Sequence, residues 1–176
     1  MVVLEEISHA EKRGAKIYGE VVGFGSASSA CPPTKADTNG SGLSRSIKAA
    51  LADSGLTAQN INCIFAHGLS CPLSDVAETR GIKEALGERA KQIPVSAIKS
   101  MTGHSGAASG AIEFIAAALA LENSKIPPTI NYDESDPECD LDYVPNQARD
   151  LEPDAALVNS FSFGGQNSTL VLHKLK

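Results

Sequence analysis

Residues 106–121 read Gly-Ala-Ala-Ser-Gly-Ala-Ile-Glu-Phe-Ile-Ala-Ala-Ala-Leu-Ala-Leu, and Glu113 is the only charged residue in this stretch. The stretch predicts a helix that is apolar on nearly every side. Such a helix has to be buried on nearly every side. We therefore expect a layer of structure on each side of it, whereas the rest of the chain provides only one sheet.

Strands and helices alternate along the rest of the chain. The apolar runs predict strands at residues 15–23, 62–66, 93–97, 155–161 and 168–173. The spacing of apolar residues and the positions of glycine predict helices at residues 5–13, 44–52 and 75–86, and a polar loop at residues 31–42. The last two strands are expected to pair antiparallel. This order predicts an α/β fold with a mixed five-stranded sheet and helices on both faces.

Two histidines and a lysine stand at the ends of these elements. Lys99 and His104 flank a run of small residues that leads into the apolar helix, and His67 follows the strand at residues 62–66. A histidine at the mouth of a helix, beside a cation and without bulky neighbours, is placed to touch a ligand carbonyl. The three residues predict a carbonyl-activating site. The alternative is that each histidine is a hydrogen-bonded core residue.

Several motifs carry a resemblance to a known family. They are His67-Gly68, Glu78, Lys99 to His104, and the stretches 126–131 (IPPTIN), 137–146 (PECDLDYVPN) and 159–167 (NSFSFGGQN). In this order they resemble the beta-ketoacyl-acyl-carrier-protein synthases, most closely the elongating enzymes of the fatty-acid type. The resemblance covers essentially the whole chain and implies one half of a thiolase-like fold.

The resemblance also implies that the chain is the carboxy-terminal half of an enzyme. The nucleophilic cysteine of the family belongs to a preceding half, and residues 1–6 resemble the tail of the last strand of that half. We therefore assign residues 1–14 to this tail and residues 15–176 to the carboxy-terminal domain. The implied reaction is a decarboxylative Claisen condensation of malonyl-carrier protein with an acyl thioester.

The resemblance assigns roles to individual residues. His67 and His104 would donate N–H groups to the oxygen of the malonyl thioester, and Lys99 would keep both imidazoles neutral. Glu78 would pair with Lys99, and the alternative for Glu78 is a surface position. Phe163 and Gly164 would form a turn that gates the acyl pocket; as bare sequence, Phe-Gly-Gly indicates only a turn.

Two residues depart from the family pattern. Leu69 and Cys71 stand where the family usually has threonines, whose hydroxyls bind the pantetheine arm of the substrate. Leucine cannot form such a hydrogen bond, and a thiol is a weak donor. Cys71 as a substitute nucleophile is disfavoured, because a residue before proline is extended and is expected to lack the helix N-terminus that lowers a thiol's pKa.

Composition restricts cofactors and location. The four cysteines are Cys31, Cys63, Cys71 and Cys139, and their spacing shows no CxxC pair. Neither a metal site nor a disulfide framework is indicated, so we expect free thiols and no bound cofactor. No apolar run is long enough to span a bilayer, and the first residues lack the pattern of a secretory signal, which predicts a cytoplasmic protein without membrane contact.

Charge restricts the partners. The net charge is −6 without a block of like charges, which argues against nucleic acid. The implied partners are an amino-terminal ketosynthase half or a second copy of the chain, and an acyl carrier protein that presents substrates on phosphopantetheine. Because that carrier is acidic, docking needs a local basic patch. Lys12, Arg13 and Lys16 form one possible cluster, although scattered basic residues are ordinary on a soluble surface.

Two other functions stay open at this stage. One is a non-catalytic partner, like the chain-length factors of polyketide synthases. The other is a truncated fragment without independent activity. His67, Lys99 and His104 together favour a condensing enzyme, because a pure binding protein does not need all three.

Overall fold

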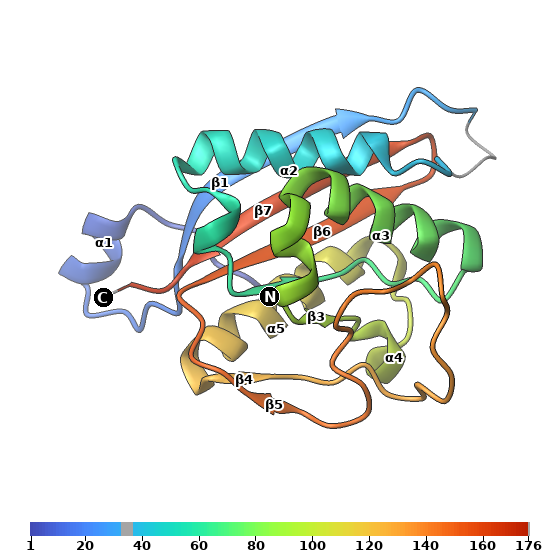
Figure 1. The fold of residues 1–176 in the computed structure, drawn as a ribbon. Coiled ribbons are helices and arrows are strands. Elements are labelled where there is room, and N and C mark those ends of the chain that lie inside the picture. The colour runs from blue at the N-terminus through green and yellow to red at the C-terminus, as the bar shows by residue number, and fades with distance from the viewer. Residues whose placement is uncertain (33–36, 176) are drawn as a thin grey trace.

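A mixed five-stranded sheet forms the centre of the molecule (Figure 1), described by a computed structural model for residues 1–32 and 37–175. Its strands, in spatial order, are β1 (Glu20–Ser28), β7 (Gln166–His173), β6 (Ala155–Ser162), β2 (Cys63–Phe65) and β3 (Val95–Ser96). The first three pair antiparallel, whereas β2 is parallel to both β6 and β3. The predicted mixed sheet and the antiparallel pairing of the last two strands are confirmed.

Helices cover both faces of the sheet. Helix α2 (Ser41–Ser54) packs on β1 and β7, and α3 (Pro72–Leu86) packs beside α2. Helix α5 (Ser109–Asn123) contacts β6, β2 and β7 on the opposite face (Figure 1).

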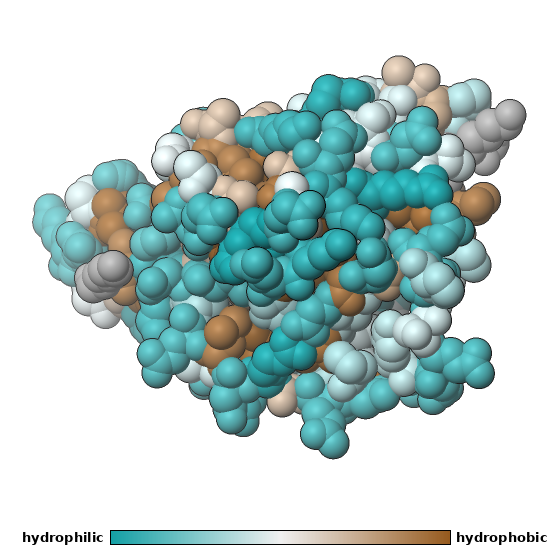
Figure 2. All heavy atoms as spheres, viewed as in Figure 1, coloured by the Kyte–Doolittle hydropathy of each residue, from teal (hydrophilic) through white to brown (hydrophobic). Residues whose placement is uncertain are grey.

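The alternation of side chains along β6 explains the two faces. Ala155 and Leu157 belong to the hydrophobic cluster under α2 and α3, whereas Ala156 and Val158 belong to the cluster under α5. Figure 2 shows the side that carries α2 and α3, where mainly hydrophilic residues face solvent. The prediction of helices on both faces is therefore confirmed.

The remaining elements are short. They are α1 (Ile7–Lys12), α4 (Lys99–Thr102), the 3-10 turns Ala58–Asn60, Gly87–Gln92 and Gly106–Ala108, and the two-stranded sheet of β4 (Lys125–Ile126) and β5 (Arg149–Asp150). Helix α4 lies in the run of small residues before the apolar helix, where the sequence predicted no helix. Its single turn forms because backbone N–H groups of Met101 and Thr102 both bond the carbonyl of Ile98.

The first strand lies further along the chain than predicted. It was expected at residues 15–23 but spans Glu20–Ser28, because the whole of β7 is available to pair with it, from His173 to Gln166. The predicted strand ended at residue 23, whereas β1 continues through Gly23 and Gly25. A Cβ at Gly23 would lie 2.4 Å from the carbonyl oxygen of Ala50, and one at Gly25 would lie 2.0 Å from that of Ser46. These glycines therefore let α2 pack closely on β1.

Other boundaries differ by a few residues. Helix α2 begins at Ser41, so it includes the end of the loop expected at residues 31–42; residues 33–36 of that loop lie outside the described residues. Helix α3 begins at Pro72 rather than residue 75, because proline is well tolerated in the first turn of a helix. None of the helices in the described ranges is long and apolar enough to cross a membrane.

The apolar helix α5 is covered by this chain mainly on one side. Glu113, Ala117 and Leu121 are completely buried against the sheet, whereas Leu119 is 44% exposed and Ile115 is half-buried. The predicted helix at residues 106–121 is confirmed, with its first turn tightened into the 3-10 turn. The face of α5 that carries Ile115 and Leu119 is thus only partly covered: it lines a hollow together with residues of the first segment, among them Leu4 and Ile7.

We predict that the isolated chain self-associates through this face of α5. Contiguous apolar surface is seldom left open in a soluble monomer. Sedimentation should show a species larger than the monomer, and Leu119→Lys should shift it towards the monomer. The control is Leu73→Lys, which changes a leucine of α3 that is 62% exposed. A wild-type monomer that binds no hydrophobic dye would contradict the prediction.

Candidate active site

The functional side chains follow the carboxyl ends of three parallel strands. His67 lies two residues beyond β2, Lys99 lies three residues beyond β3, and Phe161 stands near the end of β6. The carboxyl ends of parallel strands meet at one edge of a sheet, which is where open α/β sheets bind their ligands. The topology therefore brings these residues together.

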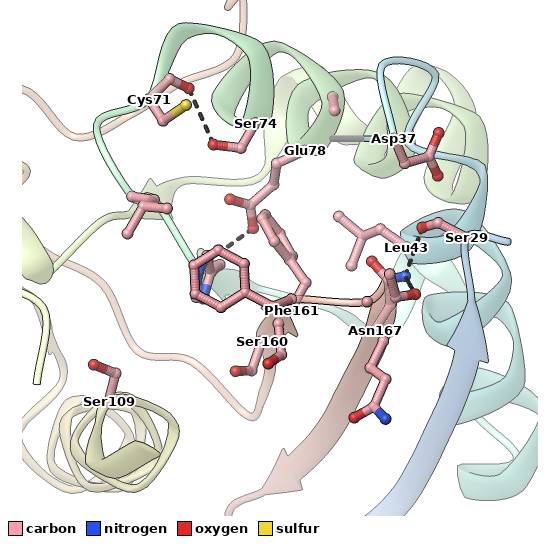
Figure 3. Close-up of a pocket in the computed structure, with 18 of the residues that line it drawn as sticks. Ser29, Asp37, Leu43, Cys71, Ser74, Glu78, Ser109, Ser160, Phe161 and Asn167 are labelled. Atoms are coloured by element: carbon pink, nitrogen blue, oxygen red, sulfur yellow. Dashed lines mark hydrogen bonds between the residues drawn. The ribbon is translucent and has the colours of Figure 1, made fainter. Parts of the chain in front are cut away.

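Glu78 holds the turn that carries His67. Its carboxylate oxygens accept the backbone N–H groups of His67 and Gly68, each at 2.9 Å, and the side-chain amide of Asn159 lies 3.4 Å from Oε1. Figure 3 shows Glu78 reaching from α3 towards this turn. The carboxyl is buried, which raises its pKa to about 7. The surface position considered for Glu78 is therefore excluded.

Lys99 pairs with Glu113, not with Glu78 as expected. Its Nζ donates to Glu113 Oε1, to the carbonyl oxygen of His67 and to His67 Nδ1, the last at 3.3 Å. These three acceptors match the three N–H groups of an ammonium. The expected pair does not form because the carboxylate of Glu78 is already bound to the His67-Gly68 turn.

The Lys99–Glu113 pair is deeply buried, with 8% and 0% of the two residues exposed. A buried charge is tolerated only when it is paired and hydrogen-bonded. Burial raises the pKa of the Glu113 carboxyl to about 7, although Lys99 acts to lower it. The ion pair joins α4 to the middle of α5.

The electrostatics keep His67 neutral. Burial is the largest cause, and the charges of Lys99 and His104 add to it, so the pKa of His67 falls to about 3. Because the ammonium of Lys99 can only donate, Nδ1 of the neutral ring accepts, and the ring proton resides on Nε2. The ring also packs on Phe161, with 4.2 Å between centroids.

His104 lies beside His67 and is exposed to solvent. The ring centroids are 5.8 Å apart in an edge-to-face arrangement. Gly103, with φ +71°, turns the chain out of α4 and brings His104 back over the site. The Nδ1 atom of His104 lies 2.9 Å from the hydroxyl of Ser109.

Both histidines line one cavity of about 660 Å³, which Figure 3 shows in close-up. The other predicted site residues that line it are Glu78, Leu69, Cys71, Phe163 and Gly164. Lys99 stands behind His67 rather than in the wall. The structure therefore gathers all the predicted site residues at one place.

Cys71 stands at a helix N-terminus, which the sequence did not predict. It is extended, as expected before proline, but it is also the N-cap of α3, with Pro72 at the first helical position. Hydrogen bonds from the side chain and backbone of Ser74 lower the pKa of the Cys71 thiol. The expectation that Cys71 lacks a helix N-terminus was therefore wrong, because the helix starts one turn earlier than predicted.

Phe163 and Gly164 lie in the turn between β6 and β7, as the Phe-Gly-Gly motif indicates. Phe163 is 92% exposed at the mouth of the cavity. Gly164 and Gly165 have φ values of +84° and +76°, which favour glycine. The side-chain amide of Asn167 bonds the carbonyl of Gly165 at 2.9 Å and closes the turn.

Sequence reasoning missed four residues that contact the site: Glu113, Ser109, Phe161 and Asn159. Glu113 gave a usable signal, since a single charge in an otherwise apolar helix needs a partner if it is buried. Ser109 lies in the predicted helix at residues 106–121, and Asn159 and Phe161 lie in the motif at residues 159–167. Nothing in the sequence singles out these three residues. In the described ranges, no group of three or more histidine, cysteine, aspartate or glutamate residues is arranged to hold a metal ion.

The two buried carboxyls make a prediction about pH. Glu78 and Glu113 have pKa values raised from 4.5 to about 7. The folded state therefore holds more protons than the unfolded state above pH 4.5, and stability falls as pH rises through 7. The lowered pKa of His67 acts in the opposite direction, but only below pH 6.5.

We therefore expect the denaturant midpoint to fall between pH 6.5 and 8, and Glu78→Gln to flatten this fall. Glutamine accepts only one of the two backbone N–H groups, so the variant is also less stable at every pH. Glu134→Gln, in an exposed loop, is the control and should keep the wild-type slope. Parallel curves for the wild type and Glu78→Gln would contradict the assignment.

Comparison with known proteins supports one family. Residues 18–133 match the model of the beta-ketoacyl synthase C-terminal domain. The chain is 52% identical over 174 residues to 3-oxoacyl-acyl-carrier-protein synthase 2 of Synechocystis sp., covering 99% of this chain and 42% of that protein. The corresponding protein of Coxiella burnetii is 44% identical over 174 residues, with the same coverage.

Solved structures agree. A type II PKS ketosynthase in complex with its acyl-carrier protein superposes with a TM-score of 0.95 at 41% identity, over 98% of this chain and 42% of that one. A beta-ketoacyl synthase from Burkholderia phymatum gives 0.91 at 36% identity, over 98% and 41%. The chain spans less than half the length of these relatives. It belongs to the beta-ketoacyl synthase family, has the thiolase-like fold, and corresponds to the C-terminal domain of the condensing enzymes.

Proposed function

We propose that this chain provides the two-histidine half of a ketosynthase active site for decarboxylative condensation of malonyl-carrier protein with an acyl thioester. The observation that carries the proposal is that His67 and His104 line one cavity with each Nδ1 already engaged. Each ring therefore has its Nε2 available to act on a ligand.

The chemistry needs a place for negative charge. When the carboxylate of the malonyl group leaves as carbon dioxide, the electrons of the broken C–C bond form an enolate, and charge develops on the thioester oxygen. Two Nε2–H groups directed at that oxygen would stabilise it. The enolate carbon then attacks the acyl carbonyl, and the thiol that held the acyl group leaves.

Lys99 supports this role through charge. A cation 3.3 Å from Nδ1 disfavours protonation of His67, so the ring remains a neutral N–H donor during the reaction. Glu113 offsets the buried charge of Lys99 on the side away from the ring. Lys99 acts here through His67 and does not serve as a nucleophile.

The nucleophilic cysteine is proposed to come from another half. Synechocystis synthase 2 is matched over only 42% of its length. We assign residues 1–14 to the tail of that half and residues 15–176 to the carboxy-terminal domain. The partly exposed face of α5 around Leu119 is the surface that the other half, or a second copy of the chain, would cover.

An acyl carrier protein is the proposed source of both substrates, carried on phosphopantetheine, and no other cofactor is needed. Among the basic residues considered for docking, Arg13 is paired with Glu5, and Lys16 is paired with Glu122. These pairs leave little net positive charge at that end of the molecule, so docking is expected mainly on the other half. The cytoplasmic location stays a prediction.

The alternative function, a non-catalytic chain-length factor, explains fewer features of the site. Two matched structures contain a ketosynthase together with a chain-length factor. A partner that only shapes the complex has no use for a buried Lys99–Glu113 pair that engages His67. We therefore favour the catalytic reading.

The test is reconstitution with the amino-terminal half of the Synechocystis relative. The joined protein should decarboxylate malonyl-carrier protein and form beta-ketoacyl product. His67→Ala and His104→Ala should each lower the decarboxylation rate by roughly 100- to 1,000-fold, as expected for loss of one oxyanion donor. His9→Ala, which changes an exposed histidine in α1, is the control.

The chain alone should form no product, and this baseline also tests Cys71. Product formed by the chain alone and lost in Cys71→Ser would make Cys71 the nucleophile. Near-full activity of both alanine variants in the joined protein would refute the two-histidine assignment. A joined wild-type protein without decarboxylation would favour a non-catalytic partner.

Leu69 and Cys71 make a separate prediction about substrate affinity. If hydroxyls at these positions bind pantetheine, Leu69→Thr with Cys71→Thr should lower the KM for malonyl-carrier protein about 30-fold, since two hydrogen bonds of about 1 kcal/mol each are added. Steady-state kinetics of the joined protein would measure this, with Leu73→Thr outside the cavity as control. An unchanged KM would show that pantetheine does not contact these side chains.

A further inference from the structure

We propose that Ser109 is a positioning residue whose hydroxyl fixes the tautomer of His104, so that the ring proton resides on Nε2. The inference rests on the proposed function, because a fixed Nε2–H matters only if His104 donates to a ligand. Ser109 is the first residue of α5 and is 4% exposed. Figure 3 shows its side chain directed from the start of the helix towards the cavity.

Two contacts of the Ser109 hydroxyl define its hydrogen-bond pattern. Its oxygen lies 3.0 Å from the backbone nitrogen of Ser105 and 2.9 Å from Nδ1 of His104. A backbone N–H can only donate, so Oγ acts as the acceptor towards Ser105. The single hydrogen of the hydroxyl is left for Nδ1, which is its other partner in the described part of the chain.

The opposite tautomer would leave a group unsatisfied. If Nδ1 carried the proton, it would donate to Oγ, and the hydroxyl hydrogen would have no acceptor among residues 1–32 and 37–175. Ser109 is buried, so an unmade hydrogen bond there is costly. The arrangement with Nδ1 as acceptor and Nε2 as donor satisfies every group.

His67 has the same pattern by different means. There the donor to Nδ1 is the ammonium of Lys99, deep under the ring. His104 is exposed on its other side, and a neutral hydroxyl at the start of α5 serves it instead. The two donors make both rings present the same nitrogen, Nε2, to one ligand oxygen.

The same hydroxyl also anchors the loop. The bond from the Ser105 backbone to Ser109 ties the segment that carries His104 to the first turn of α5. A structural anchor alone would not require the side chain of His104 to share the hydroxyl. The experiment therefore has to separate loop anchoring from control of the tautomer.

The tautomer is measured directly by nitrogen-15 chemical shifts of the His104 ring at pH 8, in the joined protein without substrate. The signal is assigned by its loss in His104→Ala. We expect Nε2–H in the wild type and in Ser109→Thr, and a mixture of tautomers in Ser109→Ala. Ser105→Ala removes a neighbouring hydroxyl that forms no hydrogen bond with the ring within the described residues, and it should match the wild type.

Activity provides the second readout. Ser109→Ala should lower kcat for malonyl decarboxylation roughly 10-fold, in the range found when a residue that orients a functional histidine is removed. KM for the carrier should stay unchanged, and Ser109→Thr should restore kcat. Loss of kcat in Ser109→Ala with His104 still wholly in the Nε2–H form would assign the hydroxyl to loop anchoring and overturn the proposal.

The two proposals fail in different ways. A wild-type His104 that carries its proton on Nδ1 overturns the role of Ser109, whatever the activity of the joined protein. Conversely, a tautomer that depends on Ser109 in a joined protein without decarboxylation would preserve the inference about Ser109 and refute the proposed function.

Discussion

The hydrogen bonds from the His67-Gly68 turn to Glu78 are the interaction on which the site depends. A chain of buried polar groups supports these hydrogen bonds along the face of the sheet that α2 and α3 cover. Asn159 of β6 contacts Glu78, Thr169 of β7 donates to Asn159, and Ser46 of α2 bonds Thr169. A buried polar group is stable only when it is satisfied. Movement of any member would therefore leave another member unpaired.

Two helices on opposite faces of the sheet each provide a carboxylate that helps to position His67. Glu78 belongs to α3, and Glu113 belongs to α5 and acts through Lys99. One carboxylate holds the backbone of the turn, whereas the other holds the cation behind the ring. Both carboxyls carry raised pKa values because they are buried, so the position of the imidazole is obtained at the cost of stability at high pH.

The sequence predicted the sheet, the helices on both faces and the set of residues around the cavity. These depend on local patterns: alternation in strands, helical spacing and short motifs. The failures concern tertiary partners. The first strand was predicted to end at residue 23, although it continues through Gly23 and Gly25, which permit close packing of α2. Spacing alone could not show whether Lys99 would reach Glu78 or Glu113.

The error over Cys71 has a related cause. Residues 72–74 carry no clear apolar periodicity, so the start of α3 was placed too late and the N-cap position was missed. Helix boundaries depend on capping contacts that form only in the folded chain. In contrast, Glu113 could have been recognised, because its charge stands alone in an apolar helix.

The close approach of α2 to β1 has a consequence for the shape of the cavity. Ser29 follows β1 and Leu43 belongs to α2, and both form part of the cavity wall. Their separation depends on Gly25, where any larger residue would place a carbon atom against the backbone of Ser46. The absence of a side chain at Gly25 therefore sets the width of the cavity on this side, although β1 itself carries no reactive group.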